Sequence, residues 1–553
     1  MTAPLLKVED LRVEYATRGR SAEVVHGVSF EVHAGKVVAL VGESGSGKST
    51  VSQALIRRLP ENGRVSGGAI HFAGEDLARL PERMLRKVRG AQIGFVPQDP
   101  GSSLNPLMRV GEQIAETLRI HRRMPRAAAA ARAVQILDEV GIPEPALRAT
   151  QYPHELSGGL RQRALIGIAW ACGPQLVIAD EPTSALDVTV QRHVLDQLDQ
   201  LVADHGTAVL LITHDLAVAA DRADEIIVMY RGEIVERGAT ADVLSAPSHE
   251  YTRRLVAAAP GLRQGRLTPQ APQAPDAVES GVFAAFRERE MRPQSGSDSI
   301  LEVRSLSKTY GVRGGSFLAA DDVSFAVPRG QTLSIVGESG SGKTTSARIA
   351  ARLMSADSGT VLLDGTDITH ARGEELRQLR RRMQVVYQNP FGSLDPRMTV
   401  ERIVSEPLRS FRIGDRASQA SLVRDLLERV RLAPELADRR PVELSGGQRQ
   451  RVAIARALAI GPELMILDEP VSALDVSVQE QILQLLVDLQ AEFGLSYLFI
   501  SHDLGVVSQI SDRIVVMQKG RVVESGDAER VFAEPAHDYT RELIAAIPGT
   551  QRA

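Results

Sequence analysis

The stretch Gly42-Glu-Ser-Gly-Ser-Gly-Lys-Ser49 decides the fold, and the chain contains it twice. The second copy is Gly337-Glu-Ser-Gly-Ser-Gly-Lys-Thr344. Each copy follows a short apolar run, which indicates a strand buried on both faces, and precedes a predicted helix. In this pattern the glycines let backbone N–H groups converge on phosphate oxygens. The sequence therefore predicts two phosphate loops, and so two nucleotide sites, in one polypeptide.

The same motifs follow each phosphate loop in the same order. They are a Gln motif at Gln98 and Gln388, a Leu-Ser-Gly-Gly motif at Leu156 and Leu444, an apolar run ending in Asp180-Glu181 and Asp468-Glu469, and a lone histidine, His214 and His502. Repetition on this scale predicts two large units of similar structure.

The chain of 553 residues is long enough for two units that each bury a core. We predict a first domain over residues 1–260, a flexible Pro/Ala/Gln-rich linker over 261–299 and a second domain over 300–553. The fold class is α/β. Each domain is expected to combine a phosphate-loop core of the RecA-like type with an antiparallel β subdomain near its start. A helical subdomain should lie between the Gln and Ser-Gly-Gly motifs.

Composition excludes several other classes of protein. The net charge is −4 and no long basic block is present, which argues against nucleic-acid binding. The single cysteine, Cys172, rules out disulfides and thiolate metal sites and is expected in the core. No apolar stretch approaches the roughly 18 residues that cross a bilayer. We therefore expect a soluble intracellular protein that serves a membrane, if at all, through other chains.

The residues of the two loops are the predicted nucleotide-binding groups. The lysines supply positive charge, and the hydroxyl after each lysine is a ligand for Mg²⁺. The predicted binding residues are Gly42, Ser44, Gly45, Ser46, Gly47, Lys48, Ser49 and Thr50 in the first unit, and Gly337, Ser339, Gly340, Ser341, Gly342, Lys343, Thr344 and Thr345 in the second. The predicted metal ligands are Ser49, Gln98 and Asp180, and Thr344, Gln388 and Asp468.

The remaining polar groups at the strand ends are predicted to be catalytic. Phosphoryl transfer mainly requires positioning and charge compensation. Glu181 and Glu469 are expected to orient and polarise the attacking water, and His214 and His502 to contact the γ-phosphate. Gln98 and Gln388 are neutral amides that can bridge Mg²⁺ and water.

Leu156-Ser-Gly-Gly-Leu-Arg-Gln-Arg163 and Leu444-Ser-Gly-Gly-Gln-Arg-Gln-Arg451 resemble the signature of ATP-binding cassette ATPases. Ser184-Ala-Leu-Asp187 and Ser472-Ala-Leu-Asp475 are similar to the D-loops of that family, so the resemblance covers nearly all of the chain except the linker. It implies ATP hydrolysis with Mg²⁺.

In this family the signature of one cassette completes the ATP site of the other. The resemblance thus implies one site from Lys48, Glu181 and Ser445, and another from Lys343, Glu469 and Ser157. The residues of the two signatures that it places on ATP are Ser157, Gly158 and Gly159, and Ser445, Gly446 and Gly447. Tyr15 and Tyr310 occupy the position where the family stacks an aromatic ring on adenine. Leu160 stands where the second copy has Gln448, a variation that the family tolerates, so both sites are expected to hydrolyse ATP.

Two further marks, each present twice, are similar to the ATPases of oligopeptide, dipeptide and nickel importers. They are the extended Gln motifs, Gln98–Pro106 and Gln388–Pro396, and the C-terminal elements Pro247–Leu255 and Pro535–Leu543. This resemblance implies two membrane permeases that dock through coupling helices, an extracytoplasmic substrate-binding protein, and a peripheral location on the cytoplasmic face of the membrane. It favours uptake of peptides, with nickel chelates, glutathione-like molecules and sugars as alternatives.

A soluble tandem cassette that acts on ribosomes or nucleic acid is the alternative function. Such proteins carry a long charged helical linker or a basic tail, whereas residues 261–299 are rich in Pro, Ala and Gln. Co-purification with permeases or with ribosomes separates the two hypotheses.

Overall fold

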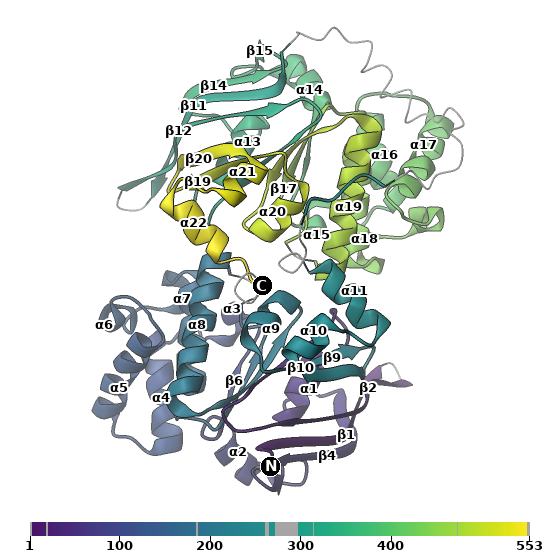
Figure 1. Ribbon diagram of the computed structural model, residues 1–553. Helices are drawn as coiled ribbons and strands as arrows, with labels where there is room; N and C mark the ends of the chain where they lie inside the picture. The colour runs from purple at the N-terminus through teal and green to yellow at the C-terminus, as the bar shows by residue number, and fades with distance from the viewer. Residues whose placement is uncertain are drawn as a thin grey trace. The chain divides into compact units, whose positions relative to one another are not determined.

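The computed structural model describes residues 3–17, 20–183, 186–259, 265–270, 297–312, 315–472 and 474–549. Contacts between Cα atoms divide the chain into two compact units, one over Met1–Arg263 and the other over Gln264–Ile547. Each unit is an α/β structure, and the second repeats the elements of the first in the same order (Figure 1). In the described ranges no helix is both long and apolar enough to cross a membrane.

The first unit is built on two sheets. A four-stranded antiparallel sheet has the order β2-β1-β4-β5, and a six-stranded sheet has the order β10-β9-β3-β8-β7-β6, parallel except for the edge strand β10. The strands are β1 (Leu6–Thr17), β2 (Arg20–Val32), β3 (Val37–Val41), β4 (Gly63–Phe72), β5 (Glu75–Asp76), β6 (Ile93–Val96), β7 (Leu176–Asp180), β8 (Ala208–Thr213), β9 (Glu225–Tyr230) and β10 (Glu233–Ala239).

Helices fill the intervals between these strands. They are α1 (Lys48–Leu55), α2 (Glu82–Val88), α3 (Pro100–Ser103), α4 (Val110–Arg122), α5 (Arg126–Glu139), α6 (Pro145–Arg148), η1 (Pro153–Glu155), α7 (Gly158–Trp170), α8 (Val188–His205), α9 (Leu216–Arg222), α10 (Thr240–Ser245) and α11 (Glu250–Ala258). Helix α4 buries Val110, Ile114 and Leu118 at four-residue spacing, which is the stripe that a packed helix presents. Figure 1 shows α4, α5 and α6 grouped within the unit, apart from β1, β2 and β4.

The second unit has the same two sheets, in the orders β12-β11-β14-β15 and β16-β17-β18-β13-β19-β20. Its strands are β11 (Ser299–Val312), β12 (Gly315–Pro328), β13 (Thr332–Val336), β14 (Ser358–Leu363), β15 (Thr366–Asp367), β16 (Met383–Val386), β17 (Leu464–Asp468), β18 (Ser496–Ile500), β19 (Arg513–Gln518) and β20 (Arg521–Asp527). Its helices are α13 (Lys343–Ala350), α14 (Gly373–Arg382), α15 (Pro390–Ser393), α16 (Val400–Ser410), α17 (Arg416–Arg429), η2 (Pro434–Asp438), η3 (Pro441–Glu443), α18 (Gly446–Leu458), α19 (Val476–Phe493), α20 (Leu504–Ile510), α21 (Ala528–Ala533) and α22 (Asp538–Ala545).

The predicted fold class is confirmed. The continuous apolar runs form β3, β7 and β8, and every residue of these strands is buried. Because β3, β6, β7 and β8 are parallel neighbours, their carboxyl ends meet at one edge of the sheet. The phosphate loop, the Gln motif, the Asp-Glu pair and the lone histidine each follow one of these four strands. The topology therefore gathers motifs that lie far apart in the sequence.

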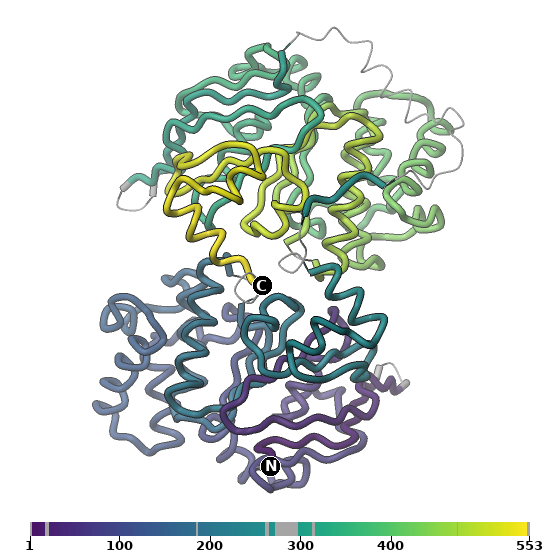
Figure 2. The backbone as a smooth tube through the Cα atoms, viewed as in Figure 1, coloured from purple at the N-terminus to yellow at the C-terminus, as the bar shows by residue number. Residues whose placement is uncertain are grey.

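A short piece of the predicted linker packs on the second unit. Leu267 is 3% exposed and belongs to a core cluster with residues of α19 and α20. Its N–H donates to Gln509 O (2.9 Å), and the Gln270 N–H donates to an Asp488 carboxylate oxygen (2.9 Å). Arg266 also forms an ion pair with Asp512. Figure 2 shows this teal segment passing over the helices of that unit. Apart from 265–270 and 297–299, the predicted linker lies outside the described residues.

Replacing Leu267 with Ala should release this segment. Leu→Ala substitutions in a core cost about 2–5 kcal/mol, and the lower end of that range suits a segment that can detach. A loss of about 2 kcal/mol would speed hydrogen exchange of the 265–270 amides roughly 30-fold in the full chain, measured by mass spectrometry. Thr268→Ala is the control, because Thr268 contacts Gln484 through its backbone carbonyl. Equal exchange rates in the two variants would show that Leu267 does not hold the segment.

Candidate functional site

Two glycines shape each phosphate loop. Gly42 directly follows β3 and has φ 154°. Its backbone lies so close to β9 that a Cβ on this residue would be 2.2 Å from Met229 O. Gly47 has φ 103° and precedes the first residue of α1. Gly337 (φ 145°) and Gly342 (φ 101°) repeat this geometry. Residues with a side chain rarely adopt these backbone conformations, so the loop requires glycine at both positions.

The loops carry groups suited to an anion. Lys48 is 4% exposed, and its ammonium donates to Gly42 O (2.7 Å) and Glu43 O (2.9 Å). Lys343 makes the same two bonds, to Gly337 O and Glu338 O (both 2.7 Å). The hydroxyls of Ser46 and Ser341 are buried and have no hydrogen-bond partner among the described residues. Buried hydroxyls are normally satisfied, so these two fit donors that await phosphate oxygens.

The carboxylates of Asp180 and Asp468 end β7 and β17 beside the hydroxyl that follows each lysine. Ser49 Oγ donates to Asp180 Oδ1 (3.1 Å), and Thr344 Oγ1 donates to Asp468 Oδ1 (3.2 Å). Burial raises the pKa of both carboxyls, and the hydroxyl hydrogen bonds oppose it only in part. A nearby Mg²⁺ would favour the ionised form.

The donor set fits Mg²⁺, which takes one or two carboxylates and completes its shell with water and substrate phosphates. In the described ranges no group of three His, Cys, Asp or Glu side chains is placed to hold a metal by itself. The predicted ligands, a hydroxyl and an amide with a single carboxylate, therefore require the phosphate oxygens of bound nucleotide.

Glu181 lies between the Gln and His motifs. Gln98 Nε2 donates to Glu181 Oε2 (2.8 Å), and His214 Nδ1 lies 3.3 Å from Glu181 Oε1. In the second unit Gln388 Nε2 donates to Glu469 Oε2 (2.7 Å), and His502 Nδ1 lies 3.1 Å from Glu469 Oε1. The structure thus brings together the three side-chain types that the sequence singled out as catalytic.

The environment keeps both glutamates ionised. Burial alone would raise the pKa of each carboxyl, but the histidine contact and the phosphate-loop lysine outweigh burial and lower it. Burial likewise would lower the pKa of His502, and the Glu469 carboxylate raises it. Both glutamates also have positive φ, 47° at Glu181 and 48° at Glu469. This sparsely populated backbone conformation occurs in both copies. Such conformations are concentrated at functional sites, where they fix the direction of a side chain.

The predicted adenine-stacking tyrosines are half-buried beside the helix that follows each loop. Tyr15 OH lies 3.4 Å from Thr50 Oγ1, and Tyr310 OH donates to Met354 Sδ (2.9 Å). Their contact with adenine remains a prediction.

The signature serines begin helices at the surface of their own units. Ser157 caps α7 by accepting from Leu160 N (3.4 Å), and Ser445 caps α18 by accepting from Gln448 N (3.3 Å). Ser157 and Ser445 are exposed, as is the glycine that follows each. Their hydroxyls and helix N-termini can thus meet a phosphate brought by another surface. Of the predicted D-loops, Ser184, Ala185 and Ala473 lie outside the described residues.

Two kinds of group near the phosphate loops were not predicted from the sequence: Ser52, and the tyrosines Tyr251 and Tyr539. Ser52 Oγ donates to Asp180 Oδ2 (2.9 Å), which fixes the second oxygen of that carboxylate. Tyr251 and Tyr539, in the C-terminal elements, reach the phosphate loops. The repeat of Pro-x-His-x-Tyr after each unit was a usable signal, but nothing in its spacing indicated the contact.

Comparison with known proteins agrees with the duplicated site. The family model "ABC transporter" matches residues 25–184 and 320–472, and the model "Oligopeptide/dipeptide transporter, C-terminal region" matches 235–290 and 523–553. The glutathione import ATP-binding protein GsiA of Salmonella choleraesuis is 44% identical over 98% of this chain and 89% of its own length. The oligopeptide transport ATP-binding protein OppD of Mycobacterium bovis is 42% identical over 99% of this chain and 98% of its own.

The chain belongs to the ABC transporter ATPases, with two tandem cassettes, as the sequence predicted. It is an ATPase whose substrate is ATP and whose cofactor is Mg²⁺.

Glu181→Gln and Glu469→Gln should each lower ATP turnover to half of the wild-type rate or less. The amide keeps the size of the side chain but cannot polarise water as a carboxylate does. The double variant should fall by about 100-fold or more. The check is phosphate release by the full chain, with Glu139→Gln on the exposed face of α5 as the control. A near-wild-type rate in either single variant contradicts two equivalent sites.

Proposed function

We propose that this chain is the ATP-hydrolysing subunit of a membrane importer, and that it binds two ATP molecules where its two cassettes face each other. The observation that carries the proposal is the duplicated Gln–Glu–His cluster, which has the same contacts in both units within a few tenths of an ångström. Neither cluster lacks a predicted hydrolytic group, so both sites are expected to turn over.

Each residue of the cluster has a task in this proposal. Glu181 and Glu469 accept a hydrogen bond from the attacking water and orient it. Gln98 and Gln388 each donate to one oxygen of that carboxylate, and the histidine contacts the other oxygen. His214 and His502 supply a hydrogen bond toward the transferred phosphoryl group. Ser49, Gln98 and Asp180, or Thr344, Gln388 and Asp468, would hold Mg²⁺, and the ion would supply positive charge beside the phosphates.

The signature serines support sites that are completed by the opposite cassette. An exposed hydroxyl at a helix N-terminus is an anion site, and each cassette has one at its surface. We assign Lys48, Glu181 and Ser445 to one site, and Lys343, Glu469 and Ser157 to the other. ATP then favours closure of the two cassettes because it contacts both.

Pairs of substitutions test this assignment. Ser445→Glu and Ser157→Glu keep a residue that a helix N-terminus tolerates but repel phosphate. Glu181→Gln with Ser445→Glu damages one site only and should retain the ATPase rate of Glu181→Gln alone. Glu181→Gln with Ser157→Glu damages both sites and should lose almost all of that rate. The reverse ranking would mean that each cassette uses its own signature.

A pocket in the first cassette supports docking of a membrane partner. It has a volume of about 420 Å³ and is lined by α2, β6 and residues of α4 and α7. The β6 residues that line the pocket precede the Gln motif in the sequence. The lining includes three arginines, Arg58, Arg86 and Arg89, and one acidic residue, Glu82. We propose that a coupling helix of a permease, with acidic side chains, occupies it. The chain would then lie on the cytoplasmic face of the membrane and work with an extracytoplasmic binding protein.

Arg86→Glu should weaken this attachment several-fold, because it reverses charge in the pocket while leaving the ATP site intact. Arg83→Glu is the matched control, on the same helix and exposed but outside the pocket lining. The measurement is co-sedimentation with membranes that contain the permeases, with basal ATPase activity as the check on folding. Equal sedimentation of the two variants would contradict docking at this pocket.

Peptides are the proposed cargo, since the relatives that match along the whole chain are named for oligopeptide transport and glutathione import. Ligand retained by the partner binding protein, identified by mass spectrometry, tests the cargo directly. The same relatives disfavour the ribosomal alternative.

A further inference from the structure

The C-terminal element of each cassette contacts the phosphate loop of that cassette. The backbone N–H of Glu43 donates to the hydroxyl oxygen of Tyr251 (2.9 Å). In the second cassette the Glu338 N–H donates to Tyr539 (3.0 Å). Both tyrosines are buried, with 2% and 4% of their surface exposed. The contact therefore occurs twice, in sequences that differ elsewhere.

The tyrosine and the lysine hold two ends of one peptide group. Glu43 N and Gly42 O belong to the same peptide, and Lys48 Nζ donates to that carbonyl (2.7 Å). The Gly337–Glu338 peptide is held in the same way by Lys343 and Tyr539. A rigid, planar peptide that is fixed at its N–H and its C=O cannot rotate without breaking one of these bonds. The tyrosine thereby sets the direction of the carbonyl that positions the lysine.

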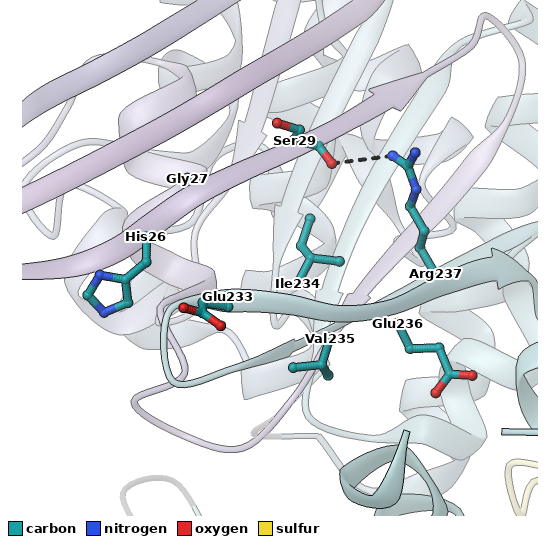
Figure 3. A pocket seen from close by; sticks show the side chains of 8 residues that line it. All are labelled: His26, Gly27, Ser29, Glu233, Ile234, Val235, Glu236 and Arg237. Carbon is teal, nitrogen blue, oxygen red and sulfur yellow. Dashed lines mark hydrogen bonds between the residues drawn. The ribbon is translucent and has the colours of Figure 1, made fainter. Parts of the chain in front are cut away.

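The tyrosines are themselves firmly held. A glutamate on the last strand of each cassette accepts backbone N–H bonds from the start of the element. Glu236 accepts from Ser248 N (2.7 Å) and His249 N (3.0 Å). Burial would raise the pKa of Glu236, but the Thr252 hydroxyl together with these backbone bonds lowers it to about 2. Figure 3 shows Glu236 leaving β10 on the side opposite Arg237. His249 Nδ1 then accepts from Tyr251 N (3.1 Å) as the cap of α11.

The second cassette repeats this anchoring. Glu524 accepts from Ala536 N (2.8 Å) and His537 N (3.0 Å), and His537 Nδ1 accepts from Tyr539 N (3.1 Å). One feature differs. The Tyr251 ring stacks on Tyr230 with centroids 4.2 Å apart, whereas Gln518 ends the corresponding strand. The hydroxyl contact with the loop thus does not depend on the stacked ring.

We propose that Tyr251 and Tyr539 are positioning residues of the ATP sites, through which each C-terminal element holds its phosphate loop in the conformation that accepts nucleotide. The C-terminal element is then part of the nucleotide site. The positioning role of the tyrosines rests on the function proposed above, because it assumes that Lys48 and Lys343 bind the phosphates of ATP. Without the hydroxyl the loop would populate other peptide orientations, and apparent affinity falls in proportion to the competent fraction.

The test is the affinity for ATP with Mg²⁺, measured by calorimetry on the full chain carrying Glu181→Gln and Glu469→Gln to prevent turnover. Tyr251→Phe removes one oxygen and keeps the ring. If one-tenth of the loops remain competent, the Kd of the first site rises about tenfold. Tyr539→Phe should do the same at the second site. Tyr230→Phe, which loses the same atom from the neighbouring ring, should leave both Kd values within about twofold, which is less than 0.5 kcal/mol.

A second readout separates positioning from simple anchoring of the helix. Coupling is reciprocal, so bound ATP should slow hydrogen exchange in α11 of the parent chain and of Tyr230→Phe, but not in Tyr251→Phe. A Tyr251→Phe chain that binds ATP with unchanged Kd, whether or not its thermal stability falls, overturns the proposal. Lys48→Ala distinguishes the two levels. If it leaves affinity unchanged the proposed site fails, whereas if it weakens binding and Tyr251→Phe does not, only the role of the tyrosine fails.

Discussion

The contact between an ionised glutamate and a partly buried histidine, at the edge where four parallel strands end, is the interaction on which the site of each cassette depends. A carboxylate that loses water normally takes up a proton, because burial disfavours charge. At Glu181 and Glu469 the histidine and the nearby lysine reverse that tendency, with a further contribution from Gln98 at Glu181 and from Ser472 at Glu469. Since each partner follows a different strand, the charge depends on the register of the whole sheet. A substitution that shifts a strand far from the site would therefore also move the side chains that keep the glutamate ionised.

The two cassettes differ around the catalytic cluster rather than within it. Ser52 bonds to Asp180, whereas Ala347 occupies the corresponding position of the second cassette and has no hydroxyl. Gln448 Oε1 accepts a hydrogen bond from the Ser445 N–H (2.9 Å), and the Leu160 side chain cannot accept one from Ser157. These differences alter the hydrogen bonds that support the Asp180 carboxylate and the signature helix.

The sequence correctly predicted the buried strands and the proximity of the Gln, Glu and His side chains, for a definable reason. Fully buried strands such as β3, β7 and β8 are continuous apolar runs, and polar residues that follow such runs must meet at one sheet edge. Burial of Leu267 and the contact from Tyr251 to Glu43 could not be predicted in this way. Both segments reach a partner more than 200 residues away, and no local spacing encodes such a contact.

The peptide held between Tyr251 and Lys48 also bears on how the loop can receive nucleotide. The ammonium of Lys48 has three N–H donors, and its bonds to Gly42 O and Glu43 O account for two of them. The Tyr251 bond lies on the opposite side of that peptide and need not be given up. A loop that keeps this bond can keep its shape when phosphate reaches the lysine. The binding energy of phosphate is then not spent on reordering the backbone.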